Sequence, residues 1–248
     1  MIKCHFEWKE TIVTILADSD FFVEIARKEI AACRFILENY ISKNPFFKTT
    51  LETYGKDPSA PPLIQRMIEA ANTFGIGPMS TVAGTIAESA VLKMKEAGAV
   101  IAVVDNGGDI ALYNAGEKPL VIGIYAGKSD FKNLGFSIEP APDILGICTS
   151  SGTVGHSISF GISDAAIIFS KNVALSDAAA TALGNALTTT GAENIKKALF
   201  VIQVPGIDGA VLVEGKDIGF WGKIPEIVKA HIDYDLITKG KNVKTVNF

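Results

Sequence analysis

The sequence predicts an α+β fold in which a duplicated unit places antiparallel strand pairs against helices. A helix of small residues over 80–97 is followed by two short apolar strands around a glycine turn, and a similar order begins at Asp177. The dipeptide Asn106-Gly107 between two apolar runs is a strong hairpin signal. Self-similarity on this scale indicates a repeated supersecondary unit. We therefore expect an antiparallel sheet packed with helices, and not a doubly wound parallel sheet.

The composition is that of an ordinary globular protein. The 248 residues are 48% hydrophobic and 20% charged, which gives ample material for a core. The net charge of −4 and the absence of long basic runs argue against nucleic acid as a partner. No apolar segment reaches the roughly 20 residues of a membrane helix, and the charged start does not resemble a secretory signal. Three widely spaced cysteines indicate a cytoplasmic protein with small buried thiols.

Local patterns predict five helices. An apolar periodicity after Ser19 or Asp20 predicts a long helix that ends at Asn44-Pro45, because the residue before a proline avoids the helical region. The pair Pro61-Pro62 suits the first turn of a second helix. The predicted helices cover residues 21–42, 61–75, 80–97, 177–188 and 192–197.

Short apolar runs bounded by turn residues predict the strands. The first run, 6–16, is a strand or tight hairpin; the others cover residues 100–105, 109–113, 120–125, 134–138, 144–148, 165–169, 199–204, 209–213 and 218–221. No flexible linker separates the two copies of the repeat. We therefore expect one domain over residues 1–248, with 1–60 packed on a duplicated core at 61–222 and a tail at 223–248 on the outside.

Gly84 lies inside the predicted helix of small residues. A glycine there costs about 1 kcal/mol relative to alanine, so we expect something to approach it closely. The neighbour could be a sheet or another helix, or the small residues could form the wall of a ligand site. The sequence leaves both interpretations open.

The stretch 146–156 contains glycines, hydroxyl residues and His156. Successive backbone amides in such a loop can form a concave nest that attracts a phosphate. A plain turn is the alternative, but two flanking apolar strands favour ligand contact. The residues expected to contact the ligand are Thr149, Ser150, Ser151 and Gly152.

Asp177 and Thr181 stand four residues apart in the next predicted helix, so their side chains share one face. A carboxylate and a hydroxyl are oxygen ligands that suit Mg²⁺, which proteins often hold together with substrate phosphates. The alternative is a carboxylate favoured by the helix dipole beside a threonine in the core. With the phosphate loop, the pair predicts a site for a phosphorylated small molecule.

Four motifs in a fixed order carry a resemblance to a known family. They are Gly84-Thr-Ile-Ala-Glu88, Asn106-Gly-Gly-Asp109, Thr149-Ser-Ser-Gly152 and Ser176-Asp-Ala-Ala-Ala-Thr181. In this order they resemble the ApbE superfamily, whose characterised members are FAD:protein FMN transferases. The whole chain most resembles an uncharacterised sister family within it.

The resemblance implies an ApbE-like, T-fold-like α+β architecture and a site for FAD and Mg²⁺. In such enzymes a threonine hydroxyl of an acceptor protein attacks the FMN phosphorus and AMP leaves. Asp177, Thr181 and the backbone carbonyl of Ala87 match the metal-binding positions. The segment that shapes the cofactor cleft corresponds to Asn106, Gly107, Gly108 and Asp109. His156 matches a histidine that could accept the hydroxyl proton, although a structural histidine is the alternative.

Two departures from the family pattern stand out. Glu88 replaces a lysine and reverses the charge at that position, and the His-x-x-Asp-Pro-x-Thr-Gly segment is missing. Glu88 could be a solvated helix residue or an anchor for the donor edge of a heterocycle. The sequence therefore supports two functions. One is an Mg²⁺-dependent flavin or nucleotide enzyme with a protein acceptor, and the other is a non-catalytic protein that binds a purine-, pterin- or flavin-like ring. Helices of small residues and an open sheet edge favour a homo-oligomer in either case.

Overall fold

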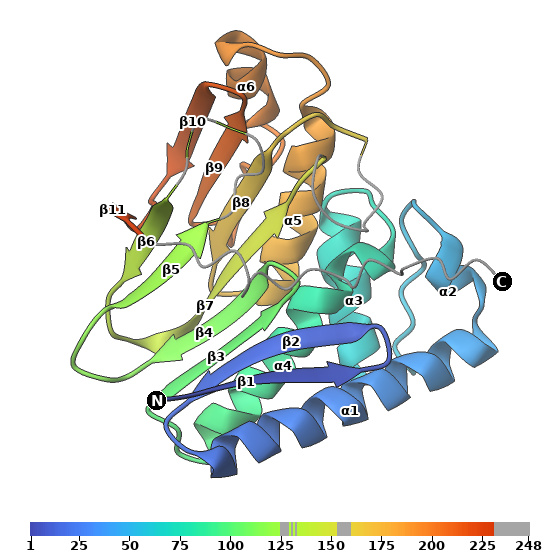
Figure 1. Ribbon diagram of the computed structural model, residues 1–248. Coiled ribbons are helices and arrows are strands. Elements are labelled where there is room, and N and C mark those ends of the chain that lie inside the picture. The colour runs from blue at the N-terminus through green and yellow to red at the C-terminus, as the bar shows by residue number, and fades with distance from the viewer. Residues whose placement is uncertain (125–128, 130, 132, 153–159, 231–248) are drawn as a thin grey trace, which may run out of the picture.

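A large antiparallel sheet is the centre of the fold. The computed structural model describes residues 1–124, 129, 131, 133–152 and 160–230. Within them, eight strands lie in the order β1-β2-β3-β4-β7-β8-β9-β10, and each neighbouring pair is antiparallel (Figure 1). The strands are β1 Ile2–Trp8, β2 Thr11–Ala17, β3 Ile101–Asn106, β4 Asp109–Asn114, β7 Ala141–Ser150, β8 Ala165–Ser170, β9 Gly209–Glu214 and β10 Asp217–Gly222. The expected antiparallel sheet is confirmed.

Helices cover one face of this sheet and a small second sheet covers part of the other (Figure 1). The helices are α1 Asp20–Lys43, α2 Phe46–Thr49, α3 Pro62–Thr73, α4 Val82–Glu96, α5 Val173–Ala186 and α6 Ala192–Ala198, and a 3-10 turn, η1 Pro78–Thr81, precedes α4. The second sheet has the order β11-β6-β5, with β5 Leu120–Ile124, β6 Leu134–Ile138 and β11 Glu226–Lys229.

The alternation of side chains along each central strand explains why both faces are covered. In β3, Ala102 and Val104 join the core under the helices, whereas Val103 points into a second core with Phe136 from the small sheet. Phe136 meets Phe169 of β8 edge to face, with ring centroids 4.8 Å apart. Successive strand residues point to opposite faces, so a strand that is apolar throughout needs a cover on both sides.

The N-terminal region docks on the core through α1 and through β2, which pairs with β3. The predicted hairpin is present as β1 and β2, and it turns at Lys9 with a φ of 56°. The Asp18 carboxylate accepts the amides of Val100 and Ile101 at 2.6 and 3.0 Å, which fixes the start of α1 beside β3. The long helix and the proline-initiated helix were also predicted correctly.

The duplicated unit is larger than the sequence suggested. A strand pair, a group of helices and a second strand pair occur twice: β1–β2, α1 to α4 and β3–β4, and then β7–β8, α5–α6 and β9–β10. Each repeat therefore begins one strand pair earlier than predicted.

The strand predicted over 199–204 is wrong, and this prediction had misplaced the second repeat. The backbone there forms turns, in which the amides of Phe200 and Val201 donate to the carbonyls of Lys197 and Ala198. Ile202 is fully buried, so the apolar residues of this segment pack into the core from irregular backbone. A short apolar run does not by itself distinguish a strand from a buried turn.

Candidate functional site

The β3–β4 turn and the end of β7 form the floor of the candidate site. Gly107 and Gly108 have φ angles of 72° and 105°, which the tight two-residue turn requires and which glycine adopts without strain. Across the turn, Asn106 faces Asp109 in the strand register. The amide of Thr149 donates to the carbonyl of Gly108 at 3.2 Å, so the turn lies directly beside β7. The structure thus brings together two residues, Gly108 and Thr149, that are 41 positions apart in the sequence.

The start of α4 closes the site from the helix side. The Asn106 side-chain amide donates to the Ala83 carbonyl at 3.1 Å, and the Gly84 amide donates to Oδ2 of Asp177 at 2.8 Å. A Cβ at Gly84 would lie 2.8 Å from Cβ of Asp177 and 3.0 Å from the Val173 carbonyl oxygen. The glycine is therefore needed because α5 packs against it. Of the two interpretations of Gly84, close packing is the one that its own contacts support.

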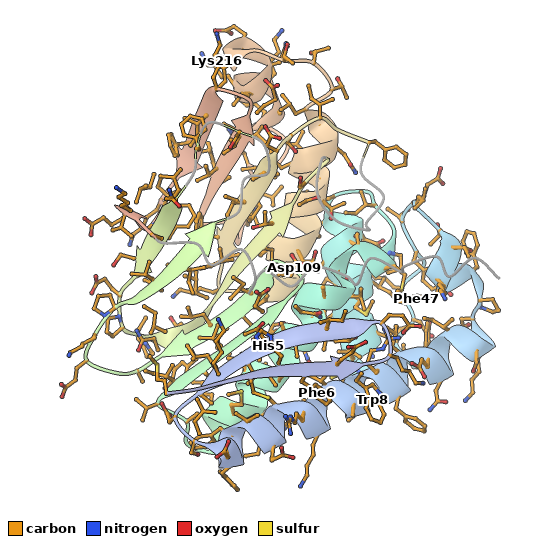
Figure 2. The ribbon with its side chains drawn as sticks, viewed as in Figure 1. His5, Phe6, Trp8, Phe47, Asp109 and Lys216 are labelled. Atoms are coloured by element: carbon orange, nitrogen blue, oxygen red, sulfur yellow. The ribbon has the colours of Figure 1, made fainter. Side chains whose placement is uncertain are left out.

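Asp177 and Asp109 are neighbouring acidic side chains in this site. Burial, and next the charge of Asp109, raise the pKa of Asp177 well above its usual value, and the bond from the Gly84 amide only partly opposes this. Burial, and next the charge of Asp105, raise the pKa of Asp109 to about 7. Asp109 lies near the centre of the molecule, between the sheet and the helices (Figure 2). Like charges in a shielded place favour protonation or a bound cation.

Glu88 lies on α4 one turn after Gly84, and its surroundings differ from those of Asp177. Its Oε1 accepts the Val173 amide at 3.3 Å, at the first residue of α5, and its Oε2 pairs with Nη1 of Arg66 at 3.2 Å. Burial raises its pKa, and the Arg66 charge opposes the rise. Both carboxylate oxygens thus have protein partners, which favours a structural role over an anchor for a heterocycle.

The expected phosphate loop is partly strand. Thr149 and Ser150 are the last residues of β7 and pair with Ile167 and Ala166 of β8. The amide of Thr149 bonds to Gly108, and that of Gly152 donates to the Ser163 carbonyl at 2.9 Å. These two amides are engaged within the protein. The half-buried hydroxyls of Thr149 and Ser150 remain as candidate phosphate ligands, and the role of Ser151 and Gly152 stays a prediction.

The other predicted residues fall in three different places. Thr181 is half-buried on α5, one turn after Asp177. Ala87 is fully buried in the middle of α4. His156 lies outside the described residues. Metal binding by Asp177, Thr181 and Ala87 therefore stays a prediction, and so does proton transfer by His156.

The sequence analysis missed two members of the site, Asp105 and Cys148. Oδ1 of Asp105 accepts the Gly108 amide at 2.9 Å, and burial raises its pKa. Cys148 is fully buried and faces Asp109 in the register of β4 and β7. A carboxylate on either side of a two-residue hairpin turn was a usable signal for Asp105. No local signal identified Cys148, because the pairing of β4 with β7 is what brings it there.

Two kinds of feature are absent from the described residues. They contain no group of three or more His, Cys, Asp and Glu side chains placed to hold a metal ion. No helix within the same ranges has the length and apolar character to cross a membrane. The predicted magnesium set is of another kind, since it combines one carboxylate with a hydroxyl and a carbonyl.

Comparison with known proteins defines first the fold and then the family of the chain. The chain resembles the apo crystal structure of Pseudomonas stutzeri flavinyl transferase ApbE with a TM-score of 0.54 and 15% identity, over 89% of this chain and 94% of that one. At this identity the likeness shows an ApbE-like fold. The family described as AbpE bacteria matches residues 2–200, and the chain belongs to it.

Two of its relatives cover almost the whole chain. A UPF0280 protein of Methanococcoides burtonii is 53% identical over 240 residues, which are 96% of this chain and 100% of that protein. A UPF0280 protein of Methanosarcina acetivorans is 53% identical over 239 residues, 96% of this chain and 93% of that protein. The predicted membership of a sister group of the flavin transferases is confirmed.

Proposed function

We propose that the protein is an Mg²⁺-dependent enzyme that binds a flavin or a related nucleotide and transfers part of it, as the flavinyl transferases of its fold do. One observation carries this proposal: Asp177 is 5% exposed, lies near the charge of Asp109, and pairs with no lysine or arginine among the described residues. Within the described part of the chain, two acidic groups thus lie together without a protein cation. Such an arrangement is costly unless a metal ion binds there.

The donor chemistry fits magnesium. Mg²⁺ prefers oxygen ligands and usually keeps several positions for water or substrate phosphate. Asp177 and Thr181 would hold it from one face of α5, and Ala87 would contribute a backbone carbonyl from α4. When bound, the metal would neutralise charge on a substrate pyrophosphate.

The chain itself supplies orientation and proton transfer. The Gly84 amide donates a hydrogen bond to Oδ2 of Asp177. This bond fixes the orientation of the carboxylate and therefore also the position of its second oxygen. Thr149 lies beside the β3–β4 turn and Ser150 beside Gly184 of α5, on opposite faces of the strand, so one of the two hydroxyls would bind a phosphate. His156 is one candidate for the group that accepts the proton of an attacking hydroxyl. Asp109 is a second, because its carboxyl group lies near Asp177 on the floor of the site.

The non-catalytic alternative depended on Glu88 as an anchor for a heterocycle. Because Arg66 and the Val173 amide occupy both of its oxygens, we favour the enzyme. The two functions still differ in a measurable way. Binding by a non-catalytic protein of this type would not require Mg²⁺.

A thermal-shift titration with FAD, with and without Mg²⁺, tests the proposal. Ligand at about 100 times its Kd stabilises a one-site protein by about 2.7 kcal/mol, so the melting temperature should rise clearly, and only when magnesium is present. Asp177→Asn should abolish the rise. Asp143→Asn is the matched control, since Asp143 is an exposed aspartate that pairs with Lys171.

Two results would count against the enzyme. An equal rise with FAD in the presence and absence of magnesium would indicate the binding protein instead. A response of Asp177→Asn equal to that of the parent would remove the metal site. If both expectations hold, release of AMP from FAD in the presence of a threonine-containing acceptor is the activity to measure.

A further inference from the structure

A cavity of about 530 Å³ lies beside the candidate site, between α1, the β1–β2 turn and the start of α4. Its size is within the range of pockets that hold small organic ligands. Asn106 and Ala83, which belong to the candidate site, also line this cavity. The two spaces therefore adjoin each other, although the cavity is formed largely by residues to which the sequence gave no role.

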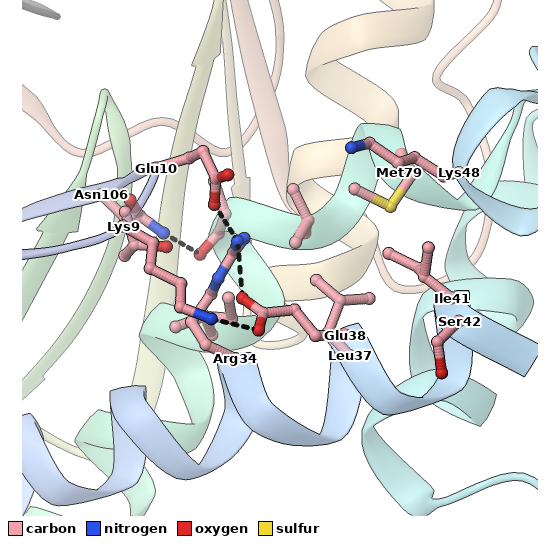
Figure 3. A pocket seen from close by; sticks show the side chains of 14 residues that line it. Lys9, Glu10, Arg34, Leu37, Glu38, Ile41, Ser42, Lys48, Met79 and Asn106 are labelled. Carbon is pink, nitrogen blue, oxygen red and sulfur yellow. Dashed lines mark hydrogen bonds and ion pairs between the residues drawn. The ribbon is translucent and has the colours of Figure 1, made fainter. Parts of the chain in front are cut away.

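The cavity has an apolar wall and a charged rim (Figure 3). Leu37 and Ile86 form part of the wall, and each is 1% exposed. The charged lining residues are Lys9, Arg34 and Lys48 on the positive side and Glu10 and Glu38 on the negative side. Three cations against two carboxylates leave a net charge of +1, in a chain whose net charge is −4. The cavity is therefore a locally positive place on an acidic protein.

Arg34 is the central polar group. Its side chain is only 11% exposed, and its guanidinium lies between Glu10 and Glu38 (Figure 3). Both of these pairs use the same nitrogen, Nη2, and the buried Nε has no hydrogen-bond partner in the described part of the chain. A guanidinium carries five N–H donors in a planar fork that suits phosphate oxygens. The protein thus leaves part of the fork unused.

Glu10 is a weak competitor for this fork. Its side chain is 76% exposed and stands on the β1–β2 turn, next to Lys9. An exposed ion pair contributes little free energy, so a ligand anion could replace Glu10 at Arg34 while its carboxylate turns to solvent. Lys9 would then face the same anion. Glu38 would remain bound, because Lys9 and Arg34 both contact it.

We propose that this cavity binds the phosphate monoester group of a small aromatic molecule, with Arg34 as the main phosphate ligand, Lys9 as its neighbour and the apolar wall against the ring. This site goes beyond the proposed function: it needs no metal, and none of its charged residues belongs to the magnesium set. It gives the protein a second point of recognition next to the first.

Isothermal titration with two pairs of probes tests the site, and EDTA keeps metal binding out of the measurement. FMN and riboflavin differ by one phosphate, as do AMP and adenosine. In at least one pair, the phosphorylated member should bind about tenfold tighter than its partner, the effect of one charge-assisted contact. Arg34→Gln should abolish that preference and leave the binding of the neutral partner unchanged.

Two further variants make the test specific. Glu10→Gln removes the competing carboxylate from an exposed position, so it should tighten binding of the phosphorylated probe. Arg27→Gln is the matched control. Arg27 stands two turns earlier on α1, and its buried Nε also lacks a partner among the described residues, but it lies over the Phe6 ring and outside the cavity. It should leave both affinities within about twofold.

The proposal is overturned if neither pair shows a preference for phosphate. It is also overturned if Arg34→Gln and Arg27→Gln have the same effect, or if Glu10→Gln does not tighten binding. These results do not depend on the outcome with FAD and magnesium. The failure of one site therefore cannot be mistaken for the failure of the other.

Discussion

Helices α4 and α5 each give a carboxylate to the start of the other, and the two contacts differ in one respect. Asp177 of α5 accepts the Gly84 amide near the start of α4, and Glu88 of α4 accepts the Val173 amide at the start of α5. Glu88 also has Arg66 as a cation partner, whereas Asp177 has the acidic Asp109 as its neighbour. The two hydrogen bonds are therefore alike in geometry, but one carboxylate lies beside a positive charge and the other beside an acidic group.

This difference separates a structural carboxylate from a candidate functional one. A carboxylate whose charge is neutralised within the protein needs no ligand, and Glu88, which pairs with Arg66, is such a case. Asp177 has no lysine or arginine partner among the described residues, which makes it a candidate for binding a cation from outside. Burial alone would not have distinguished the two, since both residues are less than 9% exposed.

The largest expected effect comes from separating the two helices. In Gly84→Val the new Cβ would lie 2.8 Å from Cβ of Asp177, and the close packing of α4 on α5 could not persist. We expect a loss of about 3 kcal/mol in the free energy of unfolding, measured by urea denaturation. Gly55→Ala is the control, because nothing lies within 4 Å of that position, and it should change stability by less than about 0.5 kcal/mol. An equal effect of both variants would mean that the helices are not locked at Gly84.

A smaller loss should follow when Glu88 is left without its cation. Arg66→Met keeps most of the apolar stem, and it should lower the free energy of unfolding by about 2 kcal/mol at pH 8. This loss is smaller than that for breaking a fully buried ion pair, because the Arg66 side chain is 37% exposed. The pKa of Glu88 would rise further without Arg66. A carboxyl with a raised pKa in the folded state stabilises fully below its unfolded pKa and loses that contribution as the pH rises.

The deficit of Arg66→Met should therefore be small at pH 4 and grow toward pH 8, as followed by urea denaturation across this range. Adding Glu88→Gln to Arg66→Met should recover part of the loss at pH 8. A deficit that does not change with pH would show that Arg66 acts only by packing.

The smallest expected effect on the free energy of unfolding is a stabilisation. Asp109 has a pKa of about 7 in the folded protein, so folding favours its neutral form. The stability that the neutral form contributes is lost as the pH rises from about 4 to about 7. Asp109→Asn copies the neutral form, and in EDTA it should stabilise the protein at pH 8 by about 1 to 2 kcal/mol, with almost no effect at pH 4. Asp143→Asn should not stabilise, because Lys171 holds the pKa of Asp143 below its usual value. A destabilised Asp109→Asn at pH 8 would indicate that the charge is neutralised by the protein.

Sequence reasoning found most of the fold where the local signals were strong. Pro62 begins a helix, Gly107 and Gly108 make the hairpin turn, and the long α1 ends where Asn44-Pro45 stops it. These features depend on the chemistry of one to four neighbouring residues. The segment 199–204 failed because its apolar residues are buried from turns, and burial from distant contacts is not visible locally.

The site was predictable in its parts and not in its electrostatics. The motifs placed Asp109 on a strand and Asp177 on a helix correctly, whereas Thr149 was expected in a loop and is in β7. The antiparallel pairing of β4 and β7 is what brings Thr149 beside the turn that precedes Asp109. Whether a carboxylate meets an arginine or another carboxylate depends on tertiary neighbours. Arg66 is 22 residues from Glu88, and Asp109 is 68 residues from Asp177, so neither relation could be seen in a short motif.

The double cover of the central strands has a consequence for local motion. All six residues of β8 are buried, because helices lie on one side and the small sheet on the other. Amide protons of such a strand exchange with solvent only through large openings of the structure, so β8 and its neighbour β7 should be among the slowest segments to exchange. Thr149 and Ser150 thus end a strand that is paired on both sides, whereas Lys9 and Glu10 lie on the exposed β1–β2 turn at the edge of the sheet. The two proposed sites therefore differ in their support, since one lies on the interior of the sheet and the other at its edge.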